Sequence, residues 1–261
     1  MDKLLTVVIP SYNVEKFLNQ TLDSFVCDEA VMKKFEVIVV DDGSKDNTAK
    51  IGKEYADKYP DTFRVISKEN GGHGSTINCG IRNAVGKYFK VVDGDDWVNT
   101  ADFVKLVEDL EKTESEYVFT NYYEYYDDVN RQKAVDFPQF KDGTEYDFAD
   151  VANKVYIPMH ALVIKTSVLK DNNIVIDEKC FYVDVEYVMF PVPFVNKVTF
   201  FDLHVYMYRL ALSTQSVSIL GFQKHINDHL RVTFHMFDFY RDYISSDKAD
   251  SAKADYMRSE E

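Results

Sequence analysis

The chain has 261 residues, of which 46% are hydrophobic and 28% charged, and its formal net charge is −14. This length and composition favour one globular α/β domain with an appended subregion, large enough to bury a sizeable core. The negative charge argues against a nucleic acid or an anionic membrane as partner, because phosphates would be repelled. Any phosphate bound here would therefore need a metal ion.

Cysteine usage and hydropathy indicate the compartment. Cys27, Cys79 and Cys180 are far apart, odd in number and without CxxC spacing, which argues against a disulfide framework or a zinc site. No apolar run reaches about 18 residues, and the N-terminus lacks the layout of a signal peptide. We therefore expect a cytoplasmic protein without a transmembrane segment. Peripheral contact with the inner face of the membrane stays open.

The first hundred residues alternate between strands and helices. Continuous apolar, β-branched runs predict strands buried on both faces, at residues 4–9, 35–40, 63–66 and 88–92. Helices are expected at residues 14–26, where Asn13 can serve as the cap, and at 47–58, 75–85 and 101–112. This pattern predicts a doubly wound, mostly parallel sheet with helices on both faces, in which ligands bind beyond the carboxyl ends of the strands.

A polar turn follows each of these strands, at residues 10–12, 41–44, 70–74 and 93–96. The last of them, DGDD, places three carboxylates within four residues, which is costly unless a cation lies nearby. Oxygen ligands suit magnesium or manganese, which share their remaining positions with substrate phosphates. An EF-hand is excluded, because Val98 would stand at the loop position that requires glycine.

After a strand at 117–125 the alternation stops. Residues 126–145 predict a hairpin or an extended excursion, and an extended segment, a helix and a strand are expected near 159–164, 184–194 and 198–210. Residues 221–244 have the spacing of an amphipathic helix. The polar residues 245–261 are expected to be frayed or disordered.

Five ordered segments carry a family resemblance: TVVIPSYNVEKFLNQTLDS, EVIVVDDGSKDNT, ENGGHGSTINCGI, GKYFKVVDGDDWV and FYVDVEY. They are similar to glycosyltransferase family 2, whose enzymes have the GT-A fold. The resemblance implies an inverting, metal-dependent transferase using Mn²⁺ or Mg²⁺. Such an enzyme moves a hexose or N-acetylhexosamine from a UDP-sugar to a hydroxyl of a glycan, polysaccharide or lipid-linked acceptor.

The same resemblance divides the chain into three regions. Residues 1–125 would form the donor-binding half, and residues 126–220 the acceptor-binding and catalytic-base half of the same domain. Residues 221–261 would add the amphipathic helix and a polar tail. Through this helix the protein could form a homodimer.

Several donor-site residues match the family position by position. The turn that borders the nucleoside would consist of Pro10, Ser11 and Tyr12. Asp42 would accept a hydrogen bond from the imide of uracil. The family's DxD pair, which binds the metal and the donor, corresponds to Asp93-Gly94-Asp95.

Other donor contacts depart from the family pattern. Asn78 fits an N-x-G segment behind the donor, but Ile77 stands where arginine is common. His73 in the glycine loop either replaces that phosphate contact or is an exposed loop residue. Arg209 belongs to a Tyr-Arg segment near the diphosphate, followed by the related segment 215–218.

The catalytic base is assigned to Asp184, because an inverting displacement needs one carboxylate to take the acceptor's proton. Val183 replaces the first acid of the family's usual Glu-Asp pair, and a role of Asp184 as helix cap is compatible with catalysis. Asp96 could be a metal ligand, an acceptor contact or a cap. His160 could be an acceptor contact, a third metal ligand or a structural residue.

Two other functions are alternatives to the transferase. A sugar-nucleotide nucleotidyltransferase shares the sheet architecture, but its glycine-rich signature belongs where this chain has PSYN after the first strand. A nucleotide-sugar binding module without catalysis is a non-enzymatic alternative. HExxH zinc chemistry is excluded at His225 and His229, because Ile226 stands where the glutamate is required.

Overall fold

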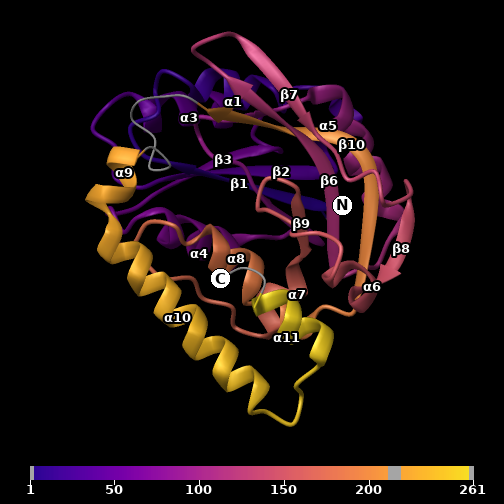
Figure 1. The fold of residues 1–261 in the computed structure, drawn as a ribbon. Coiled ribbons are helices and arrows are strands. Elements are labelled where there is room, and N and C mark those ends of the chain that lie inside the picture. Colours follow the sequence, from indigo (N-terminus) through magenta and orange to yellow (C-terminus); the bar gives the residue numbers. More distant parts are fainter. Residues whose placement is uncertain (1–2, 211–218, 259–261) are drawn as a thin grey trace.

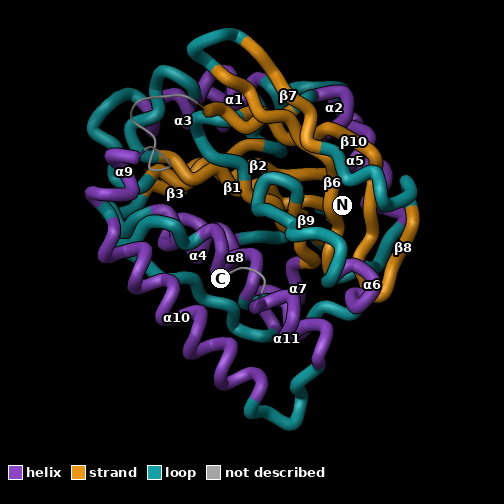
Figure 2. The backbone as a smooth tube through the Cα atoms, in the orientation of Figure 1, coloured by secondary structure: helices purple, strands orange, loops and turns teal. Residues whose placement is uncertain are grey.

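The computed structural model describes residues 3–210 and 219–258. Within these residues, a ten-stranded sheet forms the centre of the molecule, and helices cover both of its faces (Figure 1). Figure 2 shows the same arrangement by secondary structure, with the strands enclosed between helices. The predicted α/β architecture is therefore confirmed.

Four parallel strands form the first half of the sheet: β1 (Leu5–Ser11), β2 (Phe35–Asp41), β3 (Phe63–Ser67) and β4 (Tyr88–Val91). Their order is β3-β2-β1-β4. The helices that follow them are α1 (Leu18–Asp23), α3 (Thr48–Lys58), α4 (His73–Asn83) and α5 (Thr100–Asp109), with α2 (Glu29–Met32) after α1 and the 3₁₀ turn η1 (Leu110–Lys112) after α5. The carboxyl ends of these strands lie at one edge of the sheet, where the polar turns meet.

The second half of the chain extends the same sheet. An antiparallel strand, β9 (Leu162–Lys165), lies between β4 and β6 (Tyr117–Tyr126). The long strand β10 (Lys197–Leu210) runs parallel to β6, and β5 (Trp97–Val98) pairs with its far end. The remaining strands are β7 (Arg131–Val135), which forms the expected hairpin with β6, and β8 (Thr144–Asp147) beside β10.

Alternate side chains of the strands fill two separate hydrophobic clusters, one on each face. On β1, Val8 belongs to the cluster that contains α4, whereas Leu5, Val7 and Ile9 belong to the cluster of α1 and α5. This period of two is what a strand covered on both faces requires. The continuous apolar runs of the sequence are explained by this double burial.

The other helices gather mainly on the α4 face. They are α6 (Phe148–Ala152), α7 (Thr166–Asp171), α8 (Asp184–Met189), the 3₁₀ turn η2 (Val192–Phe194), α9 (Ile219–Lys224), α10 (Ile226–Ile244) and α11 (Ser251–Arg258). Helix α10 buries Val232, Met236 and Tyr243 in the same cluster as α4 and α8. No helix among the described residues is both long and apolar enough to cross a membrane.

Two expectations about local structure were wrong. Asn13 does not cap the first helix: it has a φ of 54°, and α1 begins only at Leu18. Its side chain instead accepts a hydrogen bond from the Lys45 amide at 2.8 Å, which ties two polar turns together. The polar tail contains a helix, α11, whose Tyr256 is fully buried and accepts a hydrogen bond from the Ile157 amide.

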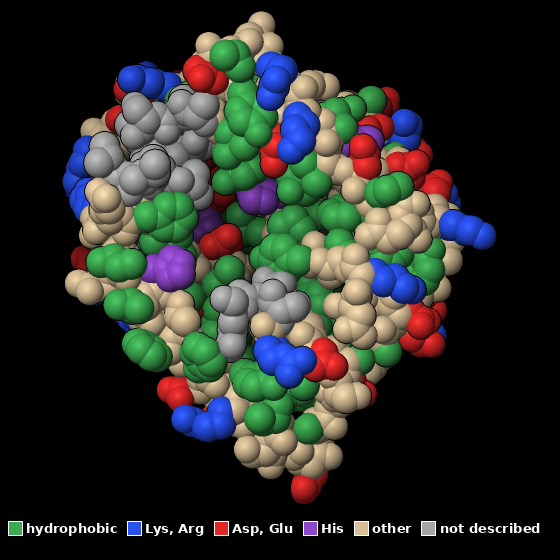
Figure 3. Space-filling model, in the orientation of Figure 1, with side chains coloured by type: hydrophobic (Ala, Val, Ile, Leu, Met, Phe, Trp, Pro, Cys, Tyr) green, Lys and Arg blue, Asp and Glu red, His purple; other side chains and the backbone are tan. Residues whose placement is uncertain are grey.

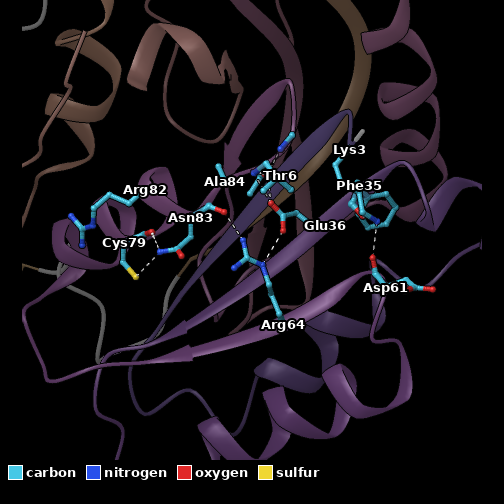
Figure 4. A network of polar contacts seen from close by, with 12 residues as sticks. Lys3, Thr6, Phe35, Glu36, Asp61, Arg64, Cys79, Arg82, Asn83 and Ala84 are labelled. Atoms are coloured by element: carbon cyan, nitrogen blue, oxygen red, sulfur yellow. Dashed lines mark hydrogen bonds and ion pairs between the residues drawn. The ribbon is translucent and has the colours of Figure 1, made fainter. Parts of the chain in front are cut away.

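A buried carboxylate joins the strands at the opposite edge of the sheet (Figure 4). Glu36, 5% exposed, accepts hydrogen bonds from Thr6 at 2.6 Å and from Nε of Arg64 at 2.9 Å. Arg64 also donates to the carbonyl of Asn83 at the end of α4. Since every partner belongs to the scaffold, this network fixes β1, β2, β3 and α4 relative to one another.

Candidate functional site

Three of the four polar turns, at residues 10–12, 70–74 and 93–96, line a pocket of about 380 Å³. Figure 3 shows a recess in this face of the molecule, with acidic and histidine side chains inside it. The pocket is lined by Pro10, Tyr12, Val14, His73, Asp93, Gly94, Asp95, Asp96, Met159, His160, Phe181, Tyr182, Asp184 and Tyr208. The fold therefore brings together side chains from six separate stretches of the chain: 10–14, 73, 93–96, 159–160, 181–184 and 208.

The DGDD turn is held directly against the end of β1. The amide of Gly94 donates to the Pro10 carbonyl at 3.1 Å. A Cβ atom at position 94 would lie 2.9 Å from that same carbonyl oxygen, so this approach requires glycine. Thr21 of α1 closes the other side of the turn, because its hydroxyl lies 3.0 Å from the Gly94 carbonyl and 2.6 Å from that of Asp96.

Asp93 and His73 form a charged pair across the pocket. Nε2 of His73 lies 2.8 Å from Oδ1 of Asp93. Burial opposes the charged form of each group, but the attraction between them outweighs burial: it lowers the pKa of Asp93 and raises the pKa of His73. His73 thus lies beside the DxD pair, at the N-terminus of α4.

Asp95 differs from its two acidic neighbours. Burial and the nearby Asp93 carboxylate raise the pKa of Asp95 to about 6. Within the described part of the chain, no other residue donates a hydrogen bond to its carboxylate, although Nε of Arg209 donates to its backbone carbonyl at 2.8 Å. Asp95 therefore offers an unengaged carboxylate to the pocket.

Asp96, by contrast, is 2% exposed and engaged by the scaffold. Its two oxygens accept hydrogen bonds from the Tyr206 hydroxyl at 2.6 Å and from the Arg209 amide at 2.7 Å. Burial, followed by repulsion from Asp95 and Asp93, raises the pKa of Asp96 well above its usual range. These contacts attach the DGDD turn to β10, which favours a structural role over metal binding.

Asp184 enters the pocket from the second half of the chain. It is the first residue of α8, whose N-cap is Val183, and burial raises the pKa of its carboxyl although His73 opposes that rise. Among the described residues, no other side chain hydrogen-bonds its carboxylate, and the backbone amides at positions 184 and 185 favour the charged form. It is thus a second carboxylate free to meet a ligand.

A buried junction positions α8. Glu186 is completely buried and accepts a hydrogen bond from the Asp177 amide at 2.7 Å. Its other oxygen lies 2.9 Å from Nδ1 of His235 on α10, and Arg231 of the same helix pairs with the Asp177 carboxylate. Helix α10 is thereby attached to both α8 and the segment that precedes α8.

Four residues assigned to donor binding make contacts within the protein instead of lining the pocket. The Ser11 hydroxyl is buried and donates to the Ile9 carbonyl at 3.1 Å. Asp42 accepts hydrogen bonds from the amides of Gly71 and Gly72, at 2.9 and 2.8 Å, and pairs with Lys68. Its carboxylate therefore shapes the glycine loop.

Asn78 and Arg209 are likewise engaged. The Asn78 amide group exchanges two hydrogen bonds with the backbone of Ile176, each within 2.9 Å, and fastens that segment to α4. Arg209, 5% exposed, pairs with Asp127 and hydrogen-bonds Gln20 at 2.6 Å. The predicted segment 215–218 lies outside the described residues.

Sequence reasoning missed several pocket residues. No role was assigned to Met159, Phe181 or Tyr182, although the last two stand in the segment FYVDVEY. Tyr208 was placed only within the Tyr-Arg segment, and His160 was left with three competing roles. Met159 and His160 reach the pocket because β9, which follows them, adjoins β4, and Tyr208 reaches it on β10. Phe181 and Tyr182 reach it because they directly precede α8. The available signal for these pocket residues was an aromatic-rich stretch beside an acidic turn. Placing that stretch at the pocket required knowledge of the strand order.

The residues present fit a divalent metal. Asp95 is unengaged, and only one oxygen of Asp93 contacts His73. The excess negative charge that raises the pKa of Asp95 would be relieved by a cation. An all-oxygen donor set of this kind suits Mn²⁺ or Mg²⁺.

Parallel strands that end at an acidic pocket, extended by a mixed second half, define a protein of the GT-A glycosyltransferase fold. Solved structures of this fold superimpose on the whole chain. The structure of S. aureus TarS 1–349 in complex with UDP-GlcNAc gives a TM-score of 0.74 at 21% identity, covering 98% of this chain and 71% of that one. Mannosyltransferase PcManGT from Pyrobaculum calidifontis, in complex with GDP-Man and Mn²⁺, gives 0.67 at 17% identity, covering 100% and 69%.

The chain belongs to glycosyl transferase family 2, whose family model matches residues 6–172. Among similar curated proteins, the uncharacterized glycosyltransferase EpsJ of Bacillus subtilis is 37% identical over 123 residues, covering 47% of this chain and 35% of EpsJ. The minor teichoic acid biosynthesis protein GgaB of the same organism is 33% identical over 111 residues, covering 42% of this chain and 12% of GgaB. The matches thus span about a third or less of these relatives' length.

Proposed function

We propose that this glycosyltransferase transfers a hexose or N-acetylhexosamine from a UDP-sugar to a hydroxyl group of a glycan, polysaccharide or lipid-linked acceptor, with inversion at the anomeric carbon. The observation that carries the proposal is that Asp95 and Asp184, two carboxylates without a side-chain partner among the described residues, line one pocket while coming from different halves of the chain. The UDP-GlcNAc complex of the structural neighbour TarS supports the choice of donor class.

Asp93 and Asp95 would hold the metal, and the Mn²⁺ bound to the neighbour PcManGT supports its use. When bound, Mn²⁺ or Mg²⁺ would neutralise charge on the departing diphosphate. Pro10 and Tyr12 border the same pocket and are assigned to the nucleoside. The contacts of Ser11, Asp42 and Asn78 lead us to propose that they support the pocket from behind.

Asp184 is proposed as the general base. It takes the proton of the acceptor hydroxyl while that oxygen bonds to the anomeric carbon and the bond from this carbon to the diphosphate oxygen breaks. The raised pKa of Asp184 makes its carboxylate a stronger base than an exposed aspartate. No separate acid is required, because the diphosphate leaves as an anion.

The test begins with binding. Thermal unfolding would be measured with UDP, GDP and a panel of UDP-sugars, each with and without Mn²⁺, followed by an assay for released UDP. We expect stabilisation by UDP that depends on the metal, and turnover with at least one UDP-hexose. The proposal fails if no nucleoside diphosphate stabilises the protein with the metal present.

We also propose a cellular location and a self-association surface for the protein. The three cysteines are free, which supports a reducing, cytoplasmic compartment. Exposed apolar side chains lie along α9 and α10, namely Phe222, Ile226, Leu230, Phe234, Phe237 and Ile244. We assign this set, the α10 stripe, to contact with a second copy of the chain.

A further inference from the structure

We propose that His160 recognises a hydroxyl group of the sugar that is transferred. This inference rests on the proposed function and names the part of the pocket that reads the donor sugar. His160 precedes β9 and lines the pocket together with Asp93, Asp95 and Asp184. The antiparallel insertion of β9 beside β4 brings it to the carboxyl edge of the parallel strands.

The His160 ring is held in place by aromatic side chains. Its centroid lies 3.8 Å from that of Tyr208, 4.9 Å from Tyr206 and 5.7 Å from Tyr122. The backbone is fixed as well, because Nζ of Lys90 donates to the His160 carbonyl at 2.9 Å. A ring fixed on three sides can present its nitrogens to a ligand at little entropic cost.

The nitrogens of His160 remain available. Within the described residues, its imidazole makes no hydrogen bond, whereas His73, the other histidine of the pocket, is paired with Asp93. Burial lowers the pKa of His160 to about 4, so the ring is neutral near pH 7 and carries one N–H donor and one acceptor nitrogen. A sugar hydroxyl, itself both donor and acceptor, matches this pair.

The surroundings favour a sugar over the other parts of the donor. A neutral imidazole offers a phosphate no charge, and the metal site at Asp93 and Asp95 is the better match for the diphosphate. The Tyr206 ring lies 4.9 Å from that of His160, and its hydroxyl accepts a hydrogen bond from the Asp93 amide at 3.2 Å, so His160 lies on the side of the pocket where the metal and the diphosphate are proposed to bind. Tyr208 lines the pocket beside His160 and adds an aromatic face against which a sugar ring can pack.

The test separates affinity for the sugar from affinity for the nucleotide. His160→Phe keeps an aromatic ring and removes both nitrogens, whereas His160→Gln keeps a donor and an acceptor. His204→Phe is a matched control, because His204 also stacks on a tyrosine, with ring centroids 4.6 Å apart, but lies outside the pocket. Affinities for UDP and for the UDP-hexose that wild type binds most tightly would be measured by calorimetry with Mn²⁺.

We expect His160→Phe to bind UDP as wild type does and to bind the UDP-hexose about tenfold more weakly. His160→Gln should recover part of the loss, and His204→Phe should show none. Monodeoxy analogues of the hexose then identify the contact. The analogue that lacks the recognised hydroxyl should bind wild type and His160→Phe equally, and the other analogues should not.

Three results would overturn the inference while leaving the proposed function intact. An equal loss of UDP and UDP-hexose would assign His160 to the scaffold or the nucleotide. Unchanged donor affinity with a raised KM for the acceptor would assign it to the acceptor. If His160→Phe does not fold, the Gln variant decides: it must bind the UDP-hexose more weakly than wild type does, and equal binding rejects the contact. Failure of the proposed function is separate, since wild type itself would then bind no UDP.

Discussion

Carboxylates with similar sequence neighbours have different roles in this protein, and their hydrogen bonds distinguish them. Asp93 pairs with His73, and Asp96 is bound by Tyr206 and the backbone of β10. Asp95 and Asp184 are the two that face the pocket without a side-chain partner among the described residues. We therefore propose that these two act directly in the reaction, whereas Asp93 would share only the metal.

Replacing Asp184 with asparagine should remove the general base while preserving shape. We expect turnover to fall by about a hundredfold or more, with little change in affinity for UDP and Mn²⁺. UDP release and calorimetry measure the two quantities. Asp171→Asn on the exposed surface of α7 serves as the control, and wild-type turnover in Asp184→Asn would show that another group is the base.

Replacing Asp95 with asparagine should affect binding first. We expect the metal-dependent part of the stabilisation by UDP to disappear, because a neutral amide is a weaker ligand for a hard cation. The measurement is thermal unfolding with UDP as Mn²⁺ is titrated, and removal of the metal by a chelator should reproduce the defect in wild type. Persistence of a metal-dependent shift in the variant would exclude Asp95 as a ligand.

The sequence could place Asp95 and Asp184 because the first follows a predicted strand and the second begins a predicted helix. It could not assign Asp42, whose partners are the amides of Gly71 and Gly72 on the next loop. Nor could it assign Asn78, which binds a backbone segment almost a hundred residues away. Such partners become known only when the chain is folded.

At the scale of elements, β4 contains a buried lysine, which is unfavourable for the free energy of folding. Lys90 is completely buried in this strand, and desolvation lowers its pKa from 10.5 to about 7. Its amine donates to the carbonyls of His160 and Leu162, at 2.9 and 3.2 Å. Strand β4, which leads to DGDD, is thus held to residues 160–162 by an amine that is only partly charged near neutral pH.

The stability of the protein should depend on pH through Lys90. Between about pH 7 and 10.5 the unfolded chain keeps the proton that the folded chain has lost, so folding is favoured as the pH rises. Relative to Lys90→Met, the free energy of unfolding of wild type should increase by up to about 1.4 kcal/mol per pH unit. Denaturant titrations in this range measure the difference.

A matched control for this prediction is Lys105→Met, which removes an exposed lysine of α5. Its pH dependence should follow that of wild type. If the curves for wild type and Lys90→Met are parallel, Lys90 keeps an ordinary pKa in the folded protein.

Most elements were predictable, for reasons that differ along the chain. The strands of the first half are buried on both faces and therefore read as continuous apolar runs. Helix α1 is shorter than its apolar spacing suggests, because the turn at Asn13 uses its side chain for the neighbouring loop. Helix α11 was missed because two buried residues, Tyr256 and Met257, suffice to dock an otherwise polar segment.

At the scale of the whole molecule, exposed apolar side chains among the described residues gather along the α10 stripe. Figure 3 shows hydrophobic side chains gathered along α10. Burial of such a surface against a second copy would remove it from water. The opposite face of the same helix is already packed against the core through Val232 and Met236.

We expect wild type to sediment as a dimer and the double variant Leu230→Glu, Phe234→Glu to sediment as a monomer, since charges would be buried at the contact. Affinity for UDP should be unchanged, because neither residue lines the pocket. Asn227→Glu, at an exposed polar position of the same helix, is the control. A wild-type monomer at every concentration tested would reject the assignment.

The position of β9 determines when β4 can complete its pairing during synthesis of the chain. Strand β4 pairs with β1 on one side and with residues 164 and 165 on the other. During synthesis, the residues of the DGDD turn leave the ribosome long before that second neighbour exists. A nascent chain of the first 125 residues would thus present β4 as an open edge, a surface prone to wrong pairing. The parallel half of the sheet consequently matures only after residues 164 and 165 have been made.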